Sequence, residues 1–122
     1  YMNIGYINVF VSNLQVSIDF YTEVLGFTLK MAESQFGYAA FEGGKVSFAL
    51  AETDDSRLVG RHTGIGLIVD DIDTVYQTLL SKGVSFEMPP TKQPWGGVLA
   101  LLKDPDGNIF YLDPLATPTH TS

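Results

Sequence analysis

In two stretches of the chain, successive residues alternate between two faces as in a β-strand. Each stretch is followed by hydrophobic residues at helical spacing. Alternation over residues 4–11 predicts a β-strand with two distinct faces. One face carries Ile7, Val9 and Val11, and the other carries Tyr6, Asn8 and Phe10. Residues 14–25 then place hydrophobic side chains at helical spacing, with Ser12 or Asn13 as the cap and Gly26 as the stop.

The same pattern starts again after a polar stretch. Residues 64–69 alternate and predict a strand on which Gly64 and Gly66 share a face, and Asp70 or Asp71 can cap the helix that follows. Further strands are predicted at 27–31, 38–41 and 45–51 in the first half and at 84–87, 98–102 and 109–112 in the second. The stretch 88–97, which contains three prolines, is predicted to be a loop.

The two halves therefore form an internal repeat of strand, helix and three strands. We predict an α+β fold in which two tandem βαβββ modules form a cupped mixed sheet with the helices on the outside. Residues 1–122 are expected to be one domain, divided into module one (1–52), a linker (53–63), module two (64–115) and a tail (116–122). Residues that point away from the helices would line the cup.

A compact turn lies near the end of the second module. The sequence Asp-Pro-Asp-Gly-Asn at 104–108 stands between two hydrophobic runs, which predicts a tight hairpin. Alternation after the turn places Tyr111 on the same face as Ile109 and Asp113. The internal repeat aligns the segments 44–48 and 107–111, so Phe48 is expected to be the counterpart of Tyr111 in the first module.

Composition excludes several classes of function. A formal net charge of −7 disfavours nucleic acids and anionic membrane surfaces and mildly favours cationic partners. The sequence has no cysteine, so disulfides and thiol chemistry are excluded. No hydrophobic run approaches the roughly 18 residues of a membrane span, and the first residues do not resemble a secretion signal. These features lead us to expect a soluble, cytoplasmic protein.

Short motifs in both halves occur in the order found in a known superfamily. They lie at 11–14 with Ser17, 20–21, 24–27, 69–71, 82–84, 95–97 and 104–108. On these motifs the chain resembles the vicinal-oxygen-chelate superfamily, which includes glyoxalases, bleomycin resistance proteins and extradiol dioxygenases. The resemblance implies paired βαβββ modules with a ligand or metal site inside the cup. Fold alone does not decide the activity.

The resemblance also shows where metal ligands would be expected. The metal enzymes of the superfamily use the first and last strand of each module, positions that correspond here to Tyr6, Phe48, Gly64 and Tyr111. A divalent centre needs about four nitrogen or oxygen donors, and of these residues only tyrosine offers one. We therefore expect no metal cofactor and no metal-dependent activity.

Two alternatives stay open. A ligand set shifted along the strands to His62, Glu52 and Asp113 would support a metal-dependent lyase, isomerase or dioxygenase of the glyoxalase type. In the other alternative, the chain is an interaction module whose own aromatic side chains fill the cup.

The residues found at the four expected metal-ligand positions favour a binding function over metal-dependent catalysis. Aromatic side chains facing the cup can stack on a flat hydrophobic, aromatic or cationic molecule, and Trp95, in a loop rich in proline and glycine, is the candidate for a mobile lid. We predict sequestration of a small molecule such as an antibiotic or toxic compound by a homodimer with no nucleic-acid or membrane partner. The predicted ligand-binding residues are Tyr6, Asn8, Phe10, Phe48, Gly64, Gly66, Trp95 and Tyr111.

Overall fold

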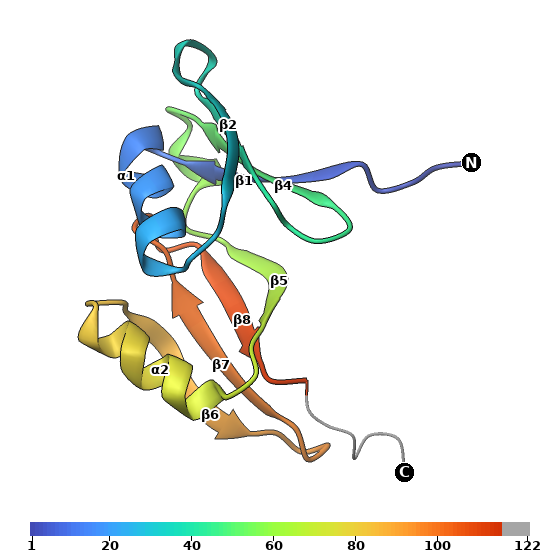
Figure 1. The fold of residues 1–122 in the computed structure, drawn as a ribbon, viewed down its shortest axis with the longest axis vertical. Coiled ribbons are helices and arrows are strands. Elements are labelled where there is room, and N and C mark those ends of the chain that lie inside the picture. The colour runs from blue at the N-terminus through green and yellow to red at the C-terminus, as the bar shows by residue number, and fades with distance from the viewer. Residues whose placement is uncertain (116–122) are drawn as a thin grey trace. The chain divides into compact units, whose positions relative to one another are not determined.

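The computed structural model describes residues 1–115 (Figure 1), and the predicted tail, 116–122, lies outside the described residues. The chain divides into two compact units. The first consists of residues 1–61 together with 105–107, and the second begins at His62 and contains the remainder. The cup expected from the two units together stays a prediction.

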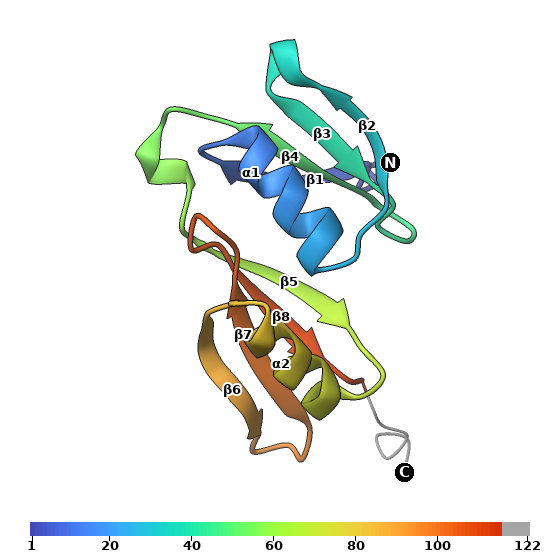
Figure 2. The same cartoon turned by 60° about the vertical axis from the view of Figure 1, so that its left-hand side comes forward.

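The first unit contains one four-stranded mixed sheet and one helix. Its elements are β1 (Tyr6–Val11), α1 (Leu14–Asp19), β2 (Leu29–Glu33), β3 (Tyr38–Phe41) and β4 (Ser47–Glu52). The strand order is β1-β4-β3-β2, with β1 and β4 parallel and the other pairs antiparallel. A π-helical turn, η1 (Phe20–Val24), continues α1, and short 3-10 turns occur at η2 (Ser34–Phe36) and η3 (Ser56–Leu58). The helix lies against one face of the sheet (Figure 2).

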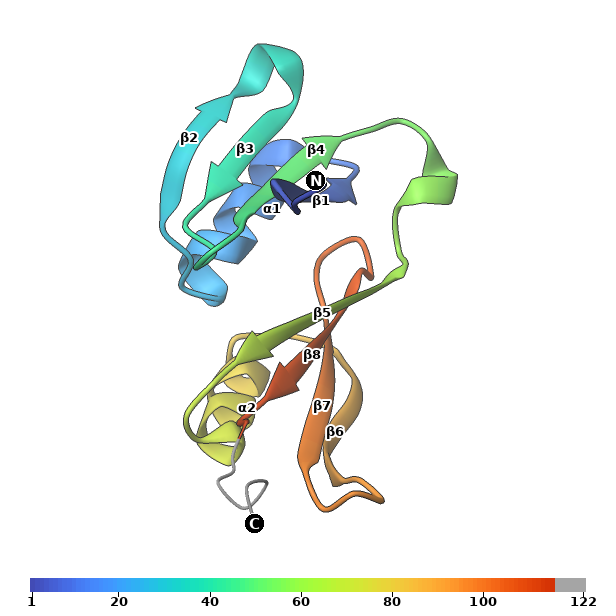
Figure 3. The ribbon, with the colours of Figure 1, turned by 90° about the vertical axis from the view of Figure 1, so that its right-hand side faces the viewer.

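The second unit repeats this topology. Its elements are β5 (His62–Ile68), α2 (Ile72–Ser81), β6 (Phe86–Lys92), β7 (Val98–Lys103) and β8 (Ile109–Asp113). The strand order is β5-β8-β7-β6, with β5 and β8 parallel (Figure 3). The predicted α+β repeat of two βαβββ modules is confirmed. Strand β5 begins within the stretch predicted as linker.

Side-chain caps start both helices where the sequence predicted. The Asn13 Oδ1 atom accepts a hydrogen bond of 3.0 Å from the Val16 N–H. The Asp71 carboxylate accepts one of 3.2 Å from the Thr74 N–H and one of 2.9 Å from the Thr74 hydroxyl. These bonds satisfy N–H groups that the first helical turn leaves without partners.

Four aromatic rings form the centre of the core of the first unit. Tyr21 contacts Phe41 and Phe48 at ring-centroid distances of 5.9 and 5.7 Å. Phe27 lies 5.4 Å from Phe48, which is only 7% exposed. In the second unit, Phe110 and Leu112 occupy the corresponding helix-covered side of β8 and are also buried.

The structure corrects the predicted position of Phe48. In the parallel ladder Phe48 pairs with Ile7, so it shares the helix-covered side with Ile7 and Val9 and not the open side with Tyr6. The internal repeat misplaced it because the two modules differ by one residue between turn and strand. A shift of one residue moves a side chain to the opposite face of a sheet.

The stretch predicted as a proline-rich loop is also different in the structure. Residues 86–92 form β6, which includes Pro89 and Pro90. This strand lies at the edge of its sheet, and its pairing with β7 is irregular between Met88 and Thr91. An edge strand with bulges tolerates proline, because the missing N–H is not needed by a second neighbour. The connecting turn is therefore limited to residues 93–97.

No helix within residues 1–115 is both long enough and apolar enough to cross a membrane.

Replacing Phe48 with alanine should test its position. We expect the Phe48→Ala variant to lose about 3–5 kcal/mol of unfolding free energy in urea, because the deletion leaves a cavity among three aromatic rings. The control is Phe36→Ala, since Phe36 is 74% exposed and should cost no more than about 0.5 kcal/mol. Equal costs for the two variants would contradict the placement of Phe48.

The two caps should differ in their dependence on pH. Asn13→Ala should cost about 1 kcal/mol of unfolding free energy at every pH, because an amide does not titrate in this range. Hydrogen bonds from the Thr74 N–H and hydroxyl hold the pKa of Asp71 below its usual value. The stabilisation that the charged Asp71 side chain provides is thus complete above the pKa that Asp71 has in the unfolded chain. It is lost as the pH falls through the lower pKa that Asp71 has in the folded protein.

Urea unfolding of Asp71→Ala, from neutral pH down to about pH 3, should therefore show a deficit relative to wild type that shrinks on acidification. A deficit that stays constant over this range would show that the charge on Asp71 is not what stabilises α2.

Candidate functional site

Each sheet has one face that its own helix covers and an opposite face that no helix of its unit covers, the open face. Ala40 and Ala49 lie on this face of the first unit and are buried. Strand pairing decides which side chains lie on the open face, because residues paired across a ladder point to the same side. On β1 these residues are Tyr6, Asn8 and Phe10, and on β4 they are Ser47, Ala49 and Ala51. On β8 they are Ile109, Tyr111 and Asp113, and on β5 they include His62, Gly66 and Ile68. All predicted site residues on β1 therefore lie on the open face, as predicted.

The open face of the first unit has a floor of small residues crossed by an aromatic side chain. Tyr38 on β3 pairs with Ala51, and Ala40 pairs with Ala49. The Tyr38 hydroxyl donates a long hydrogen bond, 3.4 Å, to Asn8 Oδ1 on β1. Because β4 lies between β3 and β1, the phenol ring must reach across β4, and only a small residue such as alanine leaves space for it.

Tyr6 and Phe10 border this surface on the outer strand. Tyr6 is 60% exposed and Phe10 is half-buried. The predicted ligand-binding residues did not include Tyr38, and the alanine floor was not predicted. The alternation of alanine with larger residues in β4 is the signal that could have indicated it.

The open face of the second unit is centred on Tyr111. A row of side chains crosses the sheet from Gly66 on β5 through Tyr111 and Leu101 to Met88 on β6. A Cβ atom added at Gly66 would lie 4.0 Å from the Tyr111 Cβ, which is an ordinary contact. Glycine at this position therefore leaves one side of the tyrosine uncovered and is not required by tight packing.

A buried turn fixes the position of Tyr111. The Asn108 N–H and side-chain amide donate to the two carboxylate oxygens of Asp104 at 2.8 and 2.9 Å. The Asp104 N–H donates in return to the Asn108 carbonyl at 2.9 Å. Three bonds between two buried residues define where β8 starts, and the strand's alternation then brings Tyr111 to the open face.

The beginning of β5 is a bulge. His62 pairs with Ile109 and Gly66 pairs with Tyr111, so four residues of β5 advance against two of β8. Gly64 adopts a φ of 73° inside this bulge, a conformation that favours glycine. The Thr63 hydroxyl donates 2.7 Å to the Ile109 carbonyl and accepts 3.1 Å from the Ile65 N–H. Gly64 thus serves the bulge and contributes no side chain to the open face.

Trp95 lies at the tip of the hairpin that joins β6 and β7. Two backbone bonds close this turn, from the Gln93 N–H to the Gly97 carbonyl and from the Gly96 N–H to the Gln93 carbonyl. The indole is 65% exposed and lies so close to Gly97 that a Cβ there would be 2.7 Å from its Nε1 atom. The residue is therefore accessible and rests on a glycine.

The structure does not bring the shifted metal ligands together. The Glu52 carboxylate accepts a 2.8 Å hydrogen bond from the Leu14 N–H at the start of α1, so it faces the helix. In the second unit, His62 pairs with Ile109 and Asp113 is four residues further along β8, about 13 Å away. Within residues 1–115 no group of three or more histidine, cysteine, aspartate or glutamate side chains could hold a metal ion.

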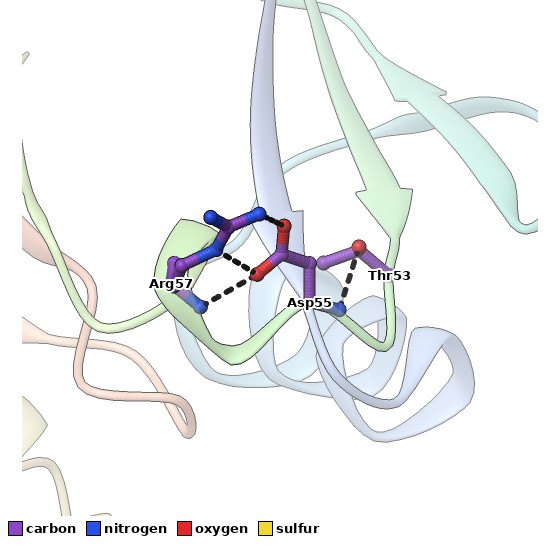
Figure 4. Close-up of polar contacts among 3 residues, drawn as sticks. All are labelled: Thr53, Asp55 and Arg57. Carbon is purple, nitrogen blue, oxygen red and sulfur yellow. Dashed lines mark hydrogen bonds and ion pairs between the residues drawn. The ribbon is translucent and has the colours of Figure 1, made fainter.

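Asp55 and Arg57 form a local ion pair in the loop before β5 (Figure 4). The Asp55 carboxylate accepts from the Arg57 Nη2 at 2.8 Å and from its Nε and backbone N–H at 3.0 Å. The guanidinium, followed by the backbone N–H, holds the pKa of Asp55 below its usual range, and the carboxylate raises that of Arg57. The Thr53 hydroxyl accepts from the Asp55 N–H at 3.0 Å. These charges stabilise the loop and are already paired with each other.

Comparison with known proteins bears out the resemblance seen in the motifs. The Glyoxalase/Bleomycin resistance protein/Dioxygenase superfamily model matches residues 3–112. The uncharacterised protein YraH of Bacillus subtilis (strain 168) is 26% identical, with 89% of this chain and 95% of YraH covered.

Two solved structures are similar over almost their whole length. A member of the same superfamily from Sphaerobacter thermophilus DSM 20745 superposes with a TM-score of 0.79 at 33% identity, covering 93% of this chain and 97% of that one. TnmS3, an antibiotic binding protein from Streptomyces sp. CB03234, gives a TM-score of 0.77 at 28% identity, covering 93% and 95%. The chain belongs to the Glyoxalase/Bleomycin resistance protein/Dioxygenase superfamily.

Proposed function

We propose that the protein binds a small hydrophobic or aromatic molecule on its open sheet faces and sequesters it without chemical change. An antibiotic or another toxic compound is the most concrete candidate. The similarity to TnmS3, an antibiotic binding protein, supports this proposal. A net charge of −7 also favours neutral or cationic ligands over anionic ones.

The observation that carries the proposal is the chemistry of the open faces. Across the open sides of β1, β4, β5 and β8, the only imidazole or carboxylate side chains are His62 and Asp113. Asn8 adds an amide there, and aromatic, aliphatic or small residues occupy the other positions of these four strands. On β2, Glu33 pairs with Tyr38 and places a carboxylate on the same side of the first sheet. Such a surface offers stacking and apolar contact to a flat ligand, whereas the donors that a divalent ion needs do not converge on it.

The proposed binding residues follow from the placement of the side chains. Tyr6, Asn8 and Phe10 are proposed contacts in the first unit, and Tyr38 takes the place that was assigned to Phe48. In the second unit Tyr111 is the proposed stacking residue. Gly66 leaves space beside it, Gly64 shapes the strand that approaches it, and Trp95 is the proposed lid.

We also propose that the protein is a homodimer. Each sheet has two edge strands, β1 and β2 in one and β5 and β6 in the other. Exposed strand edges favour pairing with another chain, and identical chains most often pair as symmetric dimers.

The proposal predicts ligand binding that needs no metal. Metal-stripped protein should bind planar aromatic compounds saturably, as measured by calorimetry and by the fluorescence of Trp95, the only tryptophan. Tyr111→Ala should weaken binding about three- to tenfold, because it removes one aromatic stacking contact.

The matched control is Leu80→Ala, which removes an exposed apolar side chain from α2, on the helix side of the same sheet. It should leave binding unchanged. Binding that appears only after a divalent metal is added would favour the metal-dependent lyase, isomerase or dioxygenase instead, and equal affinities for the two variants would contradict the role of Tyr111.

A further inference from the structure

His62 is the one imidazole on the open face of the second unit, and one of its two ring nitrogens is hydrogen-bonded to the backbone. The Gly64 N–H donates a 3.1 Å hydrogen bond to its Nδ1 atom. A neutral imidazole has one nitrogen that accepts and one that carries the proton. Because Nδ1 accepts, the proton must be on Nε2, and the ring presents Nε2–H as a donor.

The bulge in β5 is what makes this hydrogen bond possible. In a regular strand the N–H two residues further on points into the ladder or to its edge and not back toward the side chain. Gly64, with its φ of 73°, turns its N–H toward His62. The Thr63 hydroxyl, bonded to both the Ile109 carbonyl and the Ile65 N–H, holds the bulge against β8.

The same bulge brings His62 to the proposed stacking residue. Its ring centroid lies 5.0 Å from that of Tyr111, with the two ring planes inclined at 58°. The imidazole is exposed, and among residues 1–115 the structure gives its Nε2–H no acceptor. The Nε2–H donor of His62 therefore lies beside the Tyr111 ring, and a bound ligand would have to supply its acceptor.

We propose that His62 determines ligand specificity by donating its Nε2–H to a carbonyl oxygen on a planar aromatic ligand that stacks on Tyr111. This inference rests on the proposed function and narrows it to aromatic ketones, amides and lactones. The surrounding charges favour a neutral acceptor over a carboxylate. Lys103 lies in the same row as His62 and Ile109, but it is paired with Glu87 at 3.1 Å, and the chain as a whole is acidic.

The test compares two ligands of the same shape, 1-acetylnaphthalene, which has a carbonyl, and 1-ethylnaphthalene, which has a methylene in its place. Titrations are followed by the backbone amide shifts of β5 and β8 in metal-stripped protein. Wild type should bind the ketone about three- to tenfold more tightly, since one hydrogen bond to a neutral acceptor has this value. In His62→Phe, which keeps a ring against Tyr111, the ratio of the two affinities should fall to about one.

The tautomer provides an independent readout. In a His120→Gln background, His62 is the only histidine, and its long-range proton–nitrogen spectrum should show the Nε2–H form. Thr63→Val removes the hydroxyl that anchors the bulge to β8, so it should mix the two tautomers and reduce the preference for the ketone.

The possible outcomes separate this inference from the function on which it rests. If wild type binds both compounds equally, or if His62→Phe keeps the preference for the ketone, the specificity role is wrong and the binding function stands. If neither compound binds, both are wrong. An Nδ1–H tautomer in wild type would overturn the role of His62 whatever the affinities are.

Discussion

In each unit the first strand pairs in parallel with the last strand of the same unit, and the rest of the structure depends on this pairing. Parallel neighbours cannot be joined by a tight turn, so the chain must cross the sheet before it returns. The crossing segment contains the helix, which covers one face of the sheet. The pairing therefore decides which side chains enter the core and which remain on the open face.

The core is built from the side chains that this geometry turns toward the helix. Val9, Val11 and Leu50 in the first unit and Leu102, Phe110 and Leu112 in the second are all buried. Because the side chains that stabilise each unit lie mainly on the helix-covered face, the residues of the other face can vary without loss of the fold. This separation is a physical reason that a single fold can serve different functions.

The open faces have a composition that a surface exposed only to water does not require. Tyr6 is 60% and Ile68 is 68% exposed, and the alanines of β4 leave space for Tyr38 to cross the sheet. Exposed apolar side chains are thus present on the open face of each unit. Each face also carries a polar side chain with a hydrogen bond, Asn8 in the first unit and His62 in the second.

The sequence by itself determined the features that depend on neighbouring residues. The turn at 104–108 and a cap before each helix are local patterns, and the structure confirms them. It selects Asn13 over Ser12 and Asp71 over Asp70 as the capping residues. The position of Tyr111 follows from that turn because it is only the third residue after Asn108. The repeat of these patterns predicted the fold, and the resemblance of the motifs to a known superfamily predicted the family.

Only the tertiary structure decided the features that depend on how distant strands align. The face of Phe48 was mispredicted because a difference of one residue between the modules reverses it, and only pairing with Ile7 reveals the register. The partnership of His62 with Tyr111 depends on a bulge that sets four residues of β5 against two of β8. Alternation along a single strand contains no information about such a bulge, because the bulge exists only relative to the strand beside it.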